Sequence, residues 1–135
     1  NDNSSRFGKY SQLYFAGDPY QVVGLEIDHY LLERSRVTSV PTGERNYHVL
    51  HYIAEEEKSL IGRDPKSFRF IEQAAAMKKA NDKPFSDLEE FRVLKEQMLS
   101  AGFADGGQKY YEILKGILYL GNITFRDGQA TMSEV

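Results

Sequence analysis

The sequence predicts an α/β fragment in which an antiparallel strand pair is followed by several helices and a short C-terminal hairpin. Residues 21–28 alternate apolar and polar side chains, which is typical of a strand with one buried face. Residues 87–101 and 107–120 repeat apolar residues at helical spacing. Glycine, proline and asparagine clusters separate these segments, as turns do.

The strand pair occupies the first quarter of the chain. We expect one strand over residues 9–15, where β-favouring aromatic side chains are frequent, and a second over residues 21–28. Gly17-Asp18-Pro19 predicts the turn between them, which makes an antiparallel hairpin. An isolated hairpin is only marginally stable in water. We therefore expect a larger mixed central sheet, completed by sequence outside this chain, or helices packed on the pair.

The segment after the hairpin is mixed. Tyr30-Leu31-Leu32 fits either the end of the strand or a short helical turn. Pro41-Thr42-Gly43 breaks the chain, and Thr42 is an acceptable N-cap for a helix that follows it. Apolar residues line one face of that helix, and residues 55–58 are predicted to be its solvated continuation. The apolar positions are Tyr47, Leu50 and Ile53.

Two stronger helices follow a less regular stretch. Residues 63–70 are expected to be irregular, with Phe68, Phe70 and Ile71 as anchors, and residues 72–84 to be a surface excursion. Ser86 and Glu89 form a capping box before the helix over residues 87–101, and Gly102 ends it. The next helix, over residues 107–120, leads into a short strand at residues 123–125 and a turn at residues 126–128. Its predicted core stripe is Tyr110, Ile113, Leu114, Ile117 and Leu118.

Composition excludes several classes of function. The chain has 135 residues, a net charge of −3 and no cysteine. Basic residues are dispersed, which gives no indication of nucleic acid binding. The absence of cysteine excludes a disulfide framework, a thiol nucleophile and any zinc site built on cysteine. No apolar run reaches the roughly 18 residues that span a bilayer, and no signal peptide is visible. The chain does not begin with Met, and we expect it to be part of a longer protein.

The opening nine residues are the one dense polar constellation. They place hydroxyls, amides and a guanidinium together, and Gly8 leaves the backbone free to bend. A phosphate site needs donors for the oxygens, a hydroxyl for Mg²⁺ and a cation. From composition alone the same residues also fit an unstructured terminal tail. The segment is Asn1-Asp2-Asn3-Ser4-Ser5-Arg6-Phe7-Gly8-Lys9.

The order of these nine residues resembles switch I of the myosin motor domain. Kinesins share the Asn-x-x-Ser-Ser-Arg core but continue with Ser-His, whereas Phe7-Gly8-Lys9 follows here. Later segments are similar to myosin landmarks in the same order. These are residues 30–37 (YLLERSRV), 43–50 (GERNYHVL), 65–70, 89–103 and 117–125 (ILYLGNITF). The resemblance implies part of a single P-loop NTPase motor domain over residues 1–135, with switch I at residues 1–9, transducer strands at 9–37 and upper 50 kDa helices at 43–125.

The resemblance implies roles for the opening residues, position by position. Ser5 matches the serine that ligates Mg²⁺, and Ser4 matches the serine beside the γ-phosphate that positions the attacking water. Asn1 matches an asparagine that binds the nucleotide phosphates, and Asn3 a supporting position. Arg6 matches the arginine that forms a salt bridge with the switch II glutamate when the site closes, which couples closure to hydrolysis.

The resemblance also implies what the parent protein does. It would be an actin-based, cytoplasmic and cytoskeletal motor that hydrolyses ATP with Mg²⁺. F-actin and either light chains or calmodulin would bind parts outside this chain. No nucleic acid or membrane contact is expected. The isolated chain lacks the P-loop and switch II, so it is not expected to hydrolyse ATP. Two alternatives stay open, the myosin-like domain of a fungal chitin synthase and a truncated, non-motor interaction module.

Other polar residues have simpler interpretations. His48 and His51 lie three apart on a predicted helix, but no acidic residue at a suitable spacing completes a metal site. We expect structural or surface roles for them and for His29. Tyr110 and Tyr111 are predicted to lie in the core. Glu44-Arg45 fits either an ion pair at a helix start or a packing contact.

Overall fold

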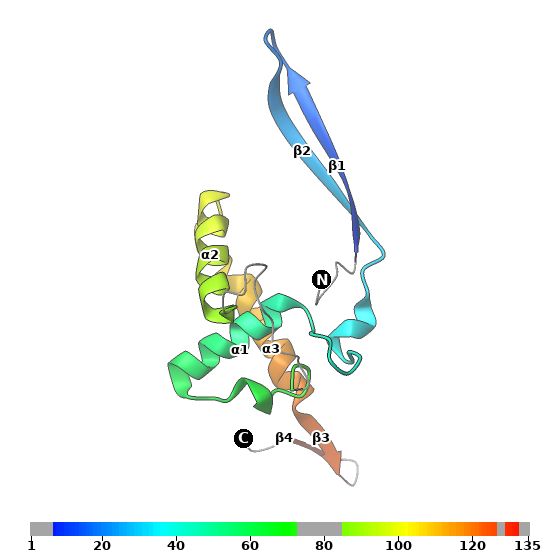
Figure 1. Cartoon of the computed structure of the whole chain (residues 1–135), viewed down its shortest axis with the longest axis vertical. Coiled ribbons are helices and arrows are strands. Elements are labelled where there is room, and N and C mark those ends of the chain that lie inside the picture. The colour runs from blue at the N-terminus through cyan, green and yellow to red at the C-terminus, as the bar shows by residue number, and fades with distance from the viewer. Residues whose placement is uncertain (1–6, 73–84, 127–128, 133–135) are drawn as a thin grey trace. The chain divides into compact units, whose positions relative to one another are not determined.

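The computed structural model describes residues 7–72, 85–126 and 129–132. The chain divides into two compact units, Asn1–Ser35 and Arg36–Val135, each described here by itself. The first is a long β-hairpin, and the second is a helical unit that ends in a small hairpin (Figure 1). This arrangement of elements confirms the predicted mixture of strands and helices.

The first unit is the antiparallel pair of β1 (Gly8–Ala16) and β2 (Gln21–Tyr30). Both strands lie where the sequence predicts them, and the predicted turn connects them. The register shifts beside Tyr14, so that Val23 is an extra residue on β2. The expectation of one buried face is wrong for the described chain, because the apolar side chains of β2 are exposed. Two strands alone have no layer to cover them, and the larger sheet expected from the sequence would have to supply it.

The hairpin ends in a short connection. Tyr30 is the last residue of β2, and Leu31 has a positive φ of 56°, so the strand does not continue through Leu31. Residues 31–33 also form no helical turn. A 3₁₀ helix, η1, then covers Arg34–Val37. The ambiguous segment is therefore part strand and part irregular connection.

Helix α1 (His48–Ile61) begins later than predicted, and Thr42 is not its N-cap. The N–H of Glu44 donates a hydrogen bond to the carbonyl of Pro41 in a tight turn, and Gly43 has a φ of 85°. Asn46 then uses its side-chain oxygen to accept from the N–H of Tyr47. These contacts hold the residues between the turn and His48 out of the helix.

Helices α2 (Asp87–Ser100) and α3 (Gln108–Gly121) confirm the two stronger predictions. The hydroxyl of Ser86 accepts a bond from the N–H of Glu89, and Gly102 has a φ of 93°, as the capping signals predicted. The buried face of α3 was predicted in part. Leu118 is buried as expected, whereas Tyr110 and Ile113 are exposed, so only Tyr111 of the two tyrosines expected in the core is buried. The ring of Tyr111 packs edge-on against Phe91 of α2 at 4.8 Å between centroids, and this contact orients the helix.

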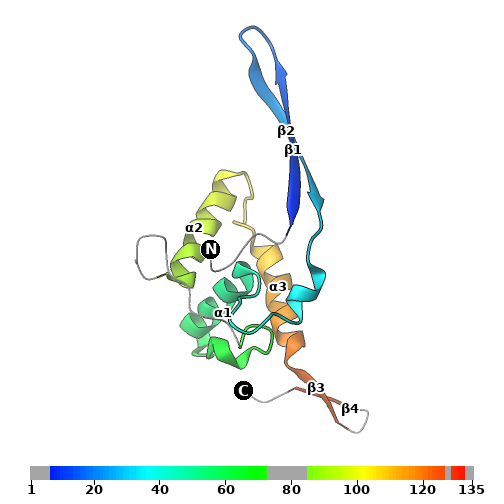
Figure 2. The ribbon, with the colours of Figure 1, turned by 45° about the vertical axis from the view of Figure 1, so that its right-hand side comes forward.

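The core of the helical unit forms where α1 meets the other helices. Helix α1 contacts both α2 and α3, and Figure 2 shows the three helices together. Phe68 and Ile71, which follow the short 3₁₀ helix η2 (Pro65–Ser67), are buried in this core as predicted. The predicted excursion at residues 72–84 lies almost wholly outside the described residues. The buried core residues are Leu50, Ile53, Ala54, Phe68, Ile71, Phe91, Tyr111 and Leu118.

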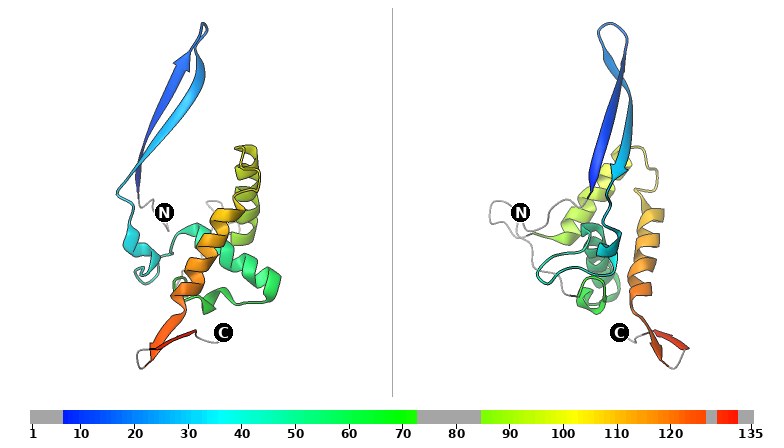
Figure 3. Two further views of the ribbon diagram at one scale, coloured as in Figure 1. Left: turned by 180° about the vertical axis from the view of Figure 1, so that it is seen from behind. Right: turned by 90° about the vertical axis from the view of Figure 1, so that its right-hand side faces the viewer.

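A second, smaller hairpin follows α3. Strand β3 (Ile123–Arg126) pairs antiparallel with β4 (Gln129–Met132), and β3 continues directly from the end of the helix (Figure 3). The strand predicted at residues 123–125 is confirmed. Residues 127 and 128 of the predicted turn lie outside the described residues.

Candidate functional site

The predicted phosphate-binding side chains precede the described part of the chain. Asn1, Asn3, Ser4, Ser5 and Arg6 all fall within residues 1–6, outside the described residues, so their predicted roles stay predictions. The structure does describe the three residues that complete the segment, 7–9. They lie at the start of β1, at the end of the hairpin opposite its turn.

This end of the hairpin fixes the point where the segment joins the sheet. Gly8 pairs with Tyr30, and Lys9 pairs with His29. The ring of Phe7 lies beside the imidazole of His29, with 6.3 Å between centroids and 45° between planes. The strand ladder therefore begins at Gly8, while the residue before it contacts β2 through its side chain.

The backbone of β2 changes direction at the same place. Leu31 lies in the left-handed region, which costs a residue with a side chain roughly 1–2 kcal/mol. Its side chain is 90% exposed, so packing of that side chain does not offset the cost. If Leu31 were extended, it would pair with Phe7 in the strand ladder. Because Leu31 is left-handed, the ladder ends at the pair of Gly8 and Tyr30.

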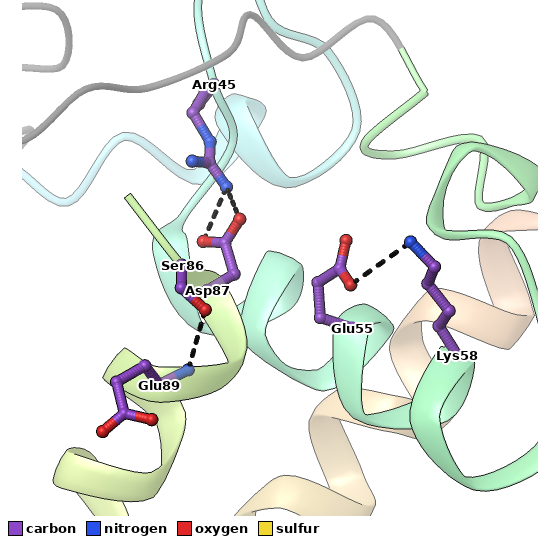
Figure 4. A network of polar contacts seen from close by, with 6 residues as sticks. All are labelled: Arg45, Glu55, Lys58, Ser86, Asp87 and Glu89. Atoms are coloured by element: carbon purple, nitrogen blue, oxygen red, sulfur yellow. Dashed lines mark hydrogen bonds and ion pairs between the residues drawn. The ribbon is translucent and has the colours of Figure 1, made fainter. Parts of the chain in front are cut away.

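The helical unit holds a buried polar network at the start of α1 and α2. Figure 4 shows the guanidinium of Arg45 reaching the carboxylate of Asp87, at 2.8 and 2.9 Å to its two oxygens. Arg36 is fully buried and donates to the carboxylate of Glu44 and to the carbonyl of Arg45. The sequence left open whether Glu44 and Arg45 form an ion pair or a packing contact. Each forms an ion pair with a different residue, Glu44 with Arg36 and Arg45 with Asp87. Both contacts join segments, so we assign them a structural role.

Glu57 is the clearest residue that the sequence reasoning missed. It was predicted to be solvated, but it is only 2% exposed. Its carboxylate accepts from the hydroxyl of Tyr119 at 2.7 Å and pairs with the ammonium of Lys115 at 2.6 Å. Burial by itself raises the pKa of Glu57, but the bonds from Lys115 and Tyr119 outweigh it and the pKa is lowered. The signal was present in the sequence, because Glu57 lies at helical spacing from Ile53 and Ala54 on the buried face.

The two histidines of α1 differ in burial, since His51 is buried and His48 is half-buried. His51 is 6% exposed, and its Nε2 has no hydrogen-bond partner among the residues that the structure describes. Burial, with the nearby charges of Arg45 and His48, lowers the pKa of His51 to about 3. Burial also lowers the pKa of His48. Within the described residues, no three His, Asp or Glu side chains lie together as a metal site would require.

Two recesses open on the surface of the helical unit. One has a volume of about 300 Å³ and the other about 590 Å³. The described lining of each includes one carboxylate, from Glu72 and Asp105 respectively, so neither brings together a pair for acid–base chemistry. The first is lined by Thr38, Ser39, Val40, Arg69, Phe70 and Glu72, and the second by Gly102, Phe103, Ala104, Asp105, Lys109, Tyr110 and Ile113.

Comparison with known proteins gives a consistent result over the whole chain. A family model described as "Myosin head (motor domain)" matches residues 1–134. A probable myosin heavy chain of Encephalitozoon cuniculi is 38% identical and covers 100% of this chain. Unconventional myosin-Id of Danio rerio is 38% identical over 99% of it, and Chitin synthase 8 of Mycosarcoma maydis is 38% identical over 97%.

These relatives are much longer than the chain. The matched region spans 8% of the E. cuniculi protein, 14% of the D. rerio protein and 7% of the chitin synthase.

The three helices α1, α2 and α3 have 14 residues each. Across the described residues, no helix has the length and apolar character needed to cross a membrane.

Proposed function

This chain belongs to the myosin motor-domain family, and from that premise we propose that residues 1–9 act as switch I, which senses the γ-phosphate of ATP and Mg²⁺. One observation carries the proposal. The family match begins at residue 1, so it includes the Asn, Ser and Arg constellation that has the chemistry of a phosphate site. The start of β1 then gives this segment a defined attachment to a strand.

Each polar residue has one task in this proposal. Asn1, with support from Asn3, donates hydrogen bonds to the nucleotide phosphates. Ser4 orients the water that attacks the γ-phosphate. Arg6 holds the closed arrangement by pairing with a switch II carboxylate outside this chain. In-line attack at phosphorus depends on positioning and charge stabilisation more than on covalent help from the protein.

The donor set fits magnesium rather than a softer metal. The Ser5 hydroxyl is a hard oxygen ligand, and the chain has no cysteine thiolate to favour zinc. Mg²⁺ usually takes one or two protein ligands, with water and phosphate oxygens completing its octahedron. When bound with ATP, the ion offsets negative charge on the phosphate oxygens.

The whole protein's activity follows from the same premise. We propose an actin-based motor with actin-activated ATP hydrolysis, acting in the cytoplasm on the cytoskeleton. F-actin and either light chains or calmodulin would bind regions outside this chain. The chain alone would not hydrolyse ATP, because it has no P-loop and no switch II. Measurable actin-activated turnover by the isolated 135 residues would contradict this part of the proposal.

A chitin synthase is the second candidate for the parent protein. Chitin synthase 8 of M. maydis matches the chain at the same 38% identity as the myosins named above. Similarity over these 135 residues therefore does not separate the two parents. The sequence after Val135 in the full reading frame does. A neck and tail would favour the motor, and a membrane-embedded glycosyltransferase would favour the synthase.

The switch I proposal is tested by one serine substitution with a matched control. Ser5→Ala and Ser11→Ala each remove one hydroxyl, the first from the proposed metal ligand and the second from an exposed position on β1. In the longer protein that carries this chain, we expect Ser5→Ala to lower MgATP turnover by about 10²-fold or more. Ser11→Ala should stay within about twofold of the parent, because it removes the same group from a strand residue that has no assigned role in turnover. Equal turnover by the two variants would refute the assignment.

A further inference from the structure

Helix α3 carries apolar side chains over a wider face than its core contacts cover. Tyr111 and Leu118 lie on the part that is buried in the core. The adjoining part, the open stripe, has three apolar side chains that are more than half exposed and a fourth that is half-buried. In the part of the chain that the structure describes, the core thus uses only one side of the apolar face of α3. The open stripe consists of Tyr110, Ile113, Ile117 and Leu120.

The spacing of the open stripe is that of a seam between two helices. Its members follow one another at intervals of three, four and three residues, as the a and d positions of a heptad do. Gly116 lies beside the stripe, one helical turn from both Ile113 and Leu120. A Cβ built at Gly116 would have no atom within 4 Å. A small residue at this place lets a second helix approach α3 closely.

A recess extends the open stripe past the first turn of α3. It has a volume of about 590 Å³, and its lining includes Tyr110 and Ile113 of the stripe. Phe103, in the turn before α3, also lines it, and its ring meets that of Tyr110 edge-on with 6.1 Å between centroids. Asp105 and Lys109 add charged groups to the lining. Exposed apolar surface bordered by charged groups is typical of a site that another protein segment covers.

The chain leaves the described residues beside the opposite end of the open stripe. Strand β4 runs back along β3, and its last residue, Met132, pairs with Ile123. Paired strand residues lie roughly 5 Å apart, so Met132 lies close to the end of α3. Ile123 follows Leu120 by three residues. Elements that are consecutive in sequence are usually neighbours in space. This chain spans only 8% and 14% of the two myosins named above, so proteins of this kind have further segments available.

We infer that the open stripe is the docking surface for an amphipathic helix of the same protein, supplied by the sequence that follows β4. That helix would begin near Leu120 and run antiparallel to α3, so that it ends over the recess beside Tyr110. The stripe is about 15 Å long, and a helix of about eleven residues covers that length. The inference does not depend on the proposed role of residues 1–9.

Thiol labelling in the longer protein that carries this chain tests whether the stripe is covered. Ile113→Cys places a thiol on the stripe, and Glu112→Cys places one on an exposed position of the same helix. Labelling is read by mass spectrometry at each site. In the folded protein we expect the Ile113→Cys thiol to react with iodoacetamide about tenfold more slowly than the Glu112→Cys thiol, with equal rates in urea. Equal rates in the folded protein would overturn the inference.

A photo-crosslinker identifies what covers the stripe and leaves the thiol result independent. In the purified monomer, p-benzoylphenylalanine in place of Tyr110 or Leu120 should crosslink to one segment after β4 in the same polypeptide. The same group in place of Glu112 should not. A crosslink to residues 1–132, to a second copy or to another protein would overturn the inference, as would the absence of any crosslink from the stripe.

Discussion

Lowering the pH should destabilise the helical unit through His51. This histidine is buried, and its Nε2 finds no hydrogen-bond partner in the described part of the chain. Its pKa in the folded state is about 3, against about 6.5 for an exposed histidine. Between these two pKa values, His51 binds a proton in the unfolded chain but stays neutral in the folded chain. Stability is complete above pH 6.5 and falls with decreasing pH until the folded pKa is reached.

The size of the effect follows from the two pKa values. At pH 5 the unfolded histidine is charged and the folded one is neutral, and 1.5 pH units at about 1.4 kcal/mol per unit give a loss of about 2 kcal/mol. Charges around the imidazole oppose protonation in the folded state. Arg45 and His48 lower the pKa of His51, while the carboxylates of Asp87 and Glu90 act to raise the pKa of His48.

Urea unfolding at pH 7 and pH 5, followed by circular dichroism at 222 nm, measures this loss. His51→Leu removes the titrating group, and the difference between the two pH values should shrink by about 2 kcal/mol. His48 remains in that variant and keeps its own smaller part of the pH dependence. His29→Gln, on the exposed strand β2, is the control and should keep the full difference. If His51→Leu loses as much stability as the parent between pH 7 and 5, the imidazole is not the responsible group.

Two paired substitutions test packing and charge in the same unit. A Cβ at Gly121 would lie 2.7 Å from the ring of Phe70, so Gly121→Ala should destabilise the folded unit by about 1–3 kcal/mol. A Cβ at Gly116, also on α3, would have no atom within 4 Å, so Gly116→Ala should stabilise the unit by about 0.5–1 kcal/mol. Equal shifts in thermal midpoint for the two alanines would contradict the close approach. Glu57→Gln should cost about 1–3 kcal/mol because the buried side chain of residue 57 loses its ion pair with Lys115. Glu55→Gln, whose ion pair is at the surface, should change stability by less than about 0.5 kcal/mol. A urea midpoint for Glu57→Gln as high as that for Glu55→Gln would show that the buried pair adds nothing.

The parts of the fold predicted from the sequence are those decided by local chemistry. Ser86 caps α2 through a bond within its own turn, and Gly102 ends that helix with a backbone conformation that favours glycine. The period-2 pattern likewise places β2, since alternation is a property of the strand itself.

The parts that failed depend on contacts distant in sequence. Thr42 has a capping side chain, but Asn46 bonds to the carbonyls of Val37 and Phe70 and delays the start of α1. Both tyrosines at the start of α3 were expected in the core, but only Tyr111 is buried, because its ring packs against Phe91 of α2. For the candidate site, the sequence supplies residues 1–6, and the structure adds the strand junction that follows them.

The irregular segment before residue 73 has a further property that its secondary structure does not suggest. Asn122, at the end of α3, accepts from the N–H of Arg69 at 2.9 Å and donates to the carbonyl of Ser67 at 2.8 Å. Asn46 donates to the carbonyl of Phe70. Side-chain amides thus replace the partners that a strand would provide. The amide hydrogen of Arg69 should exchange with deuterated solvent as slowly as those within α1, although Arg69 belongs to no helix or strand.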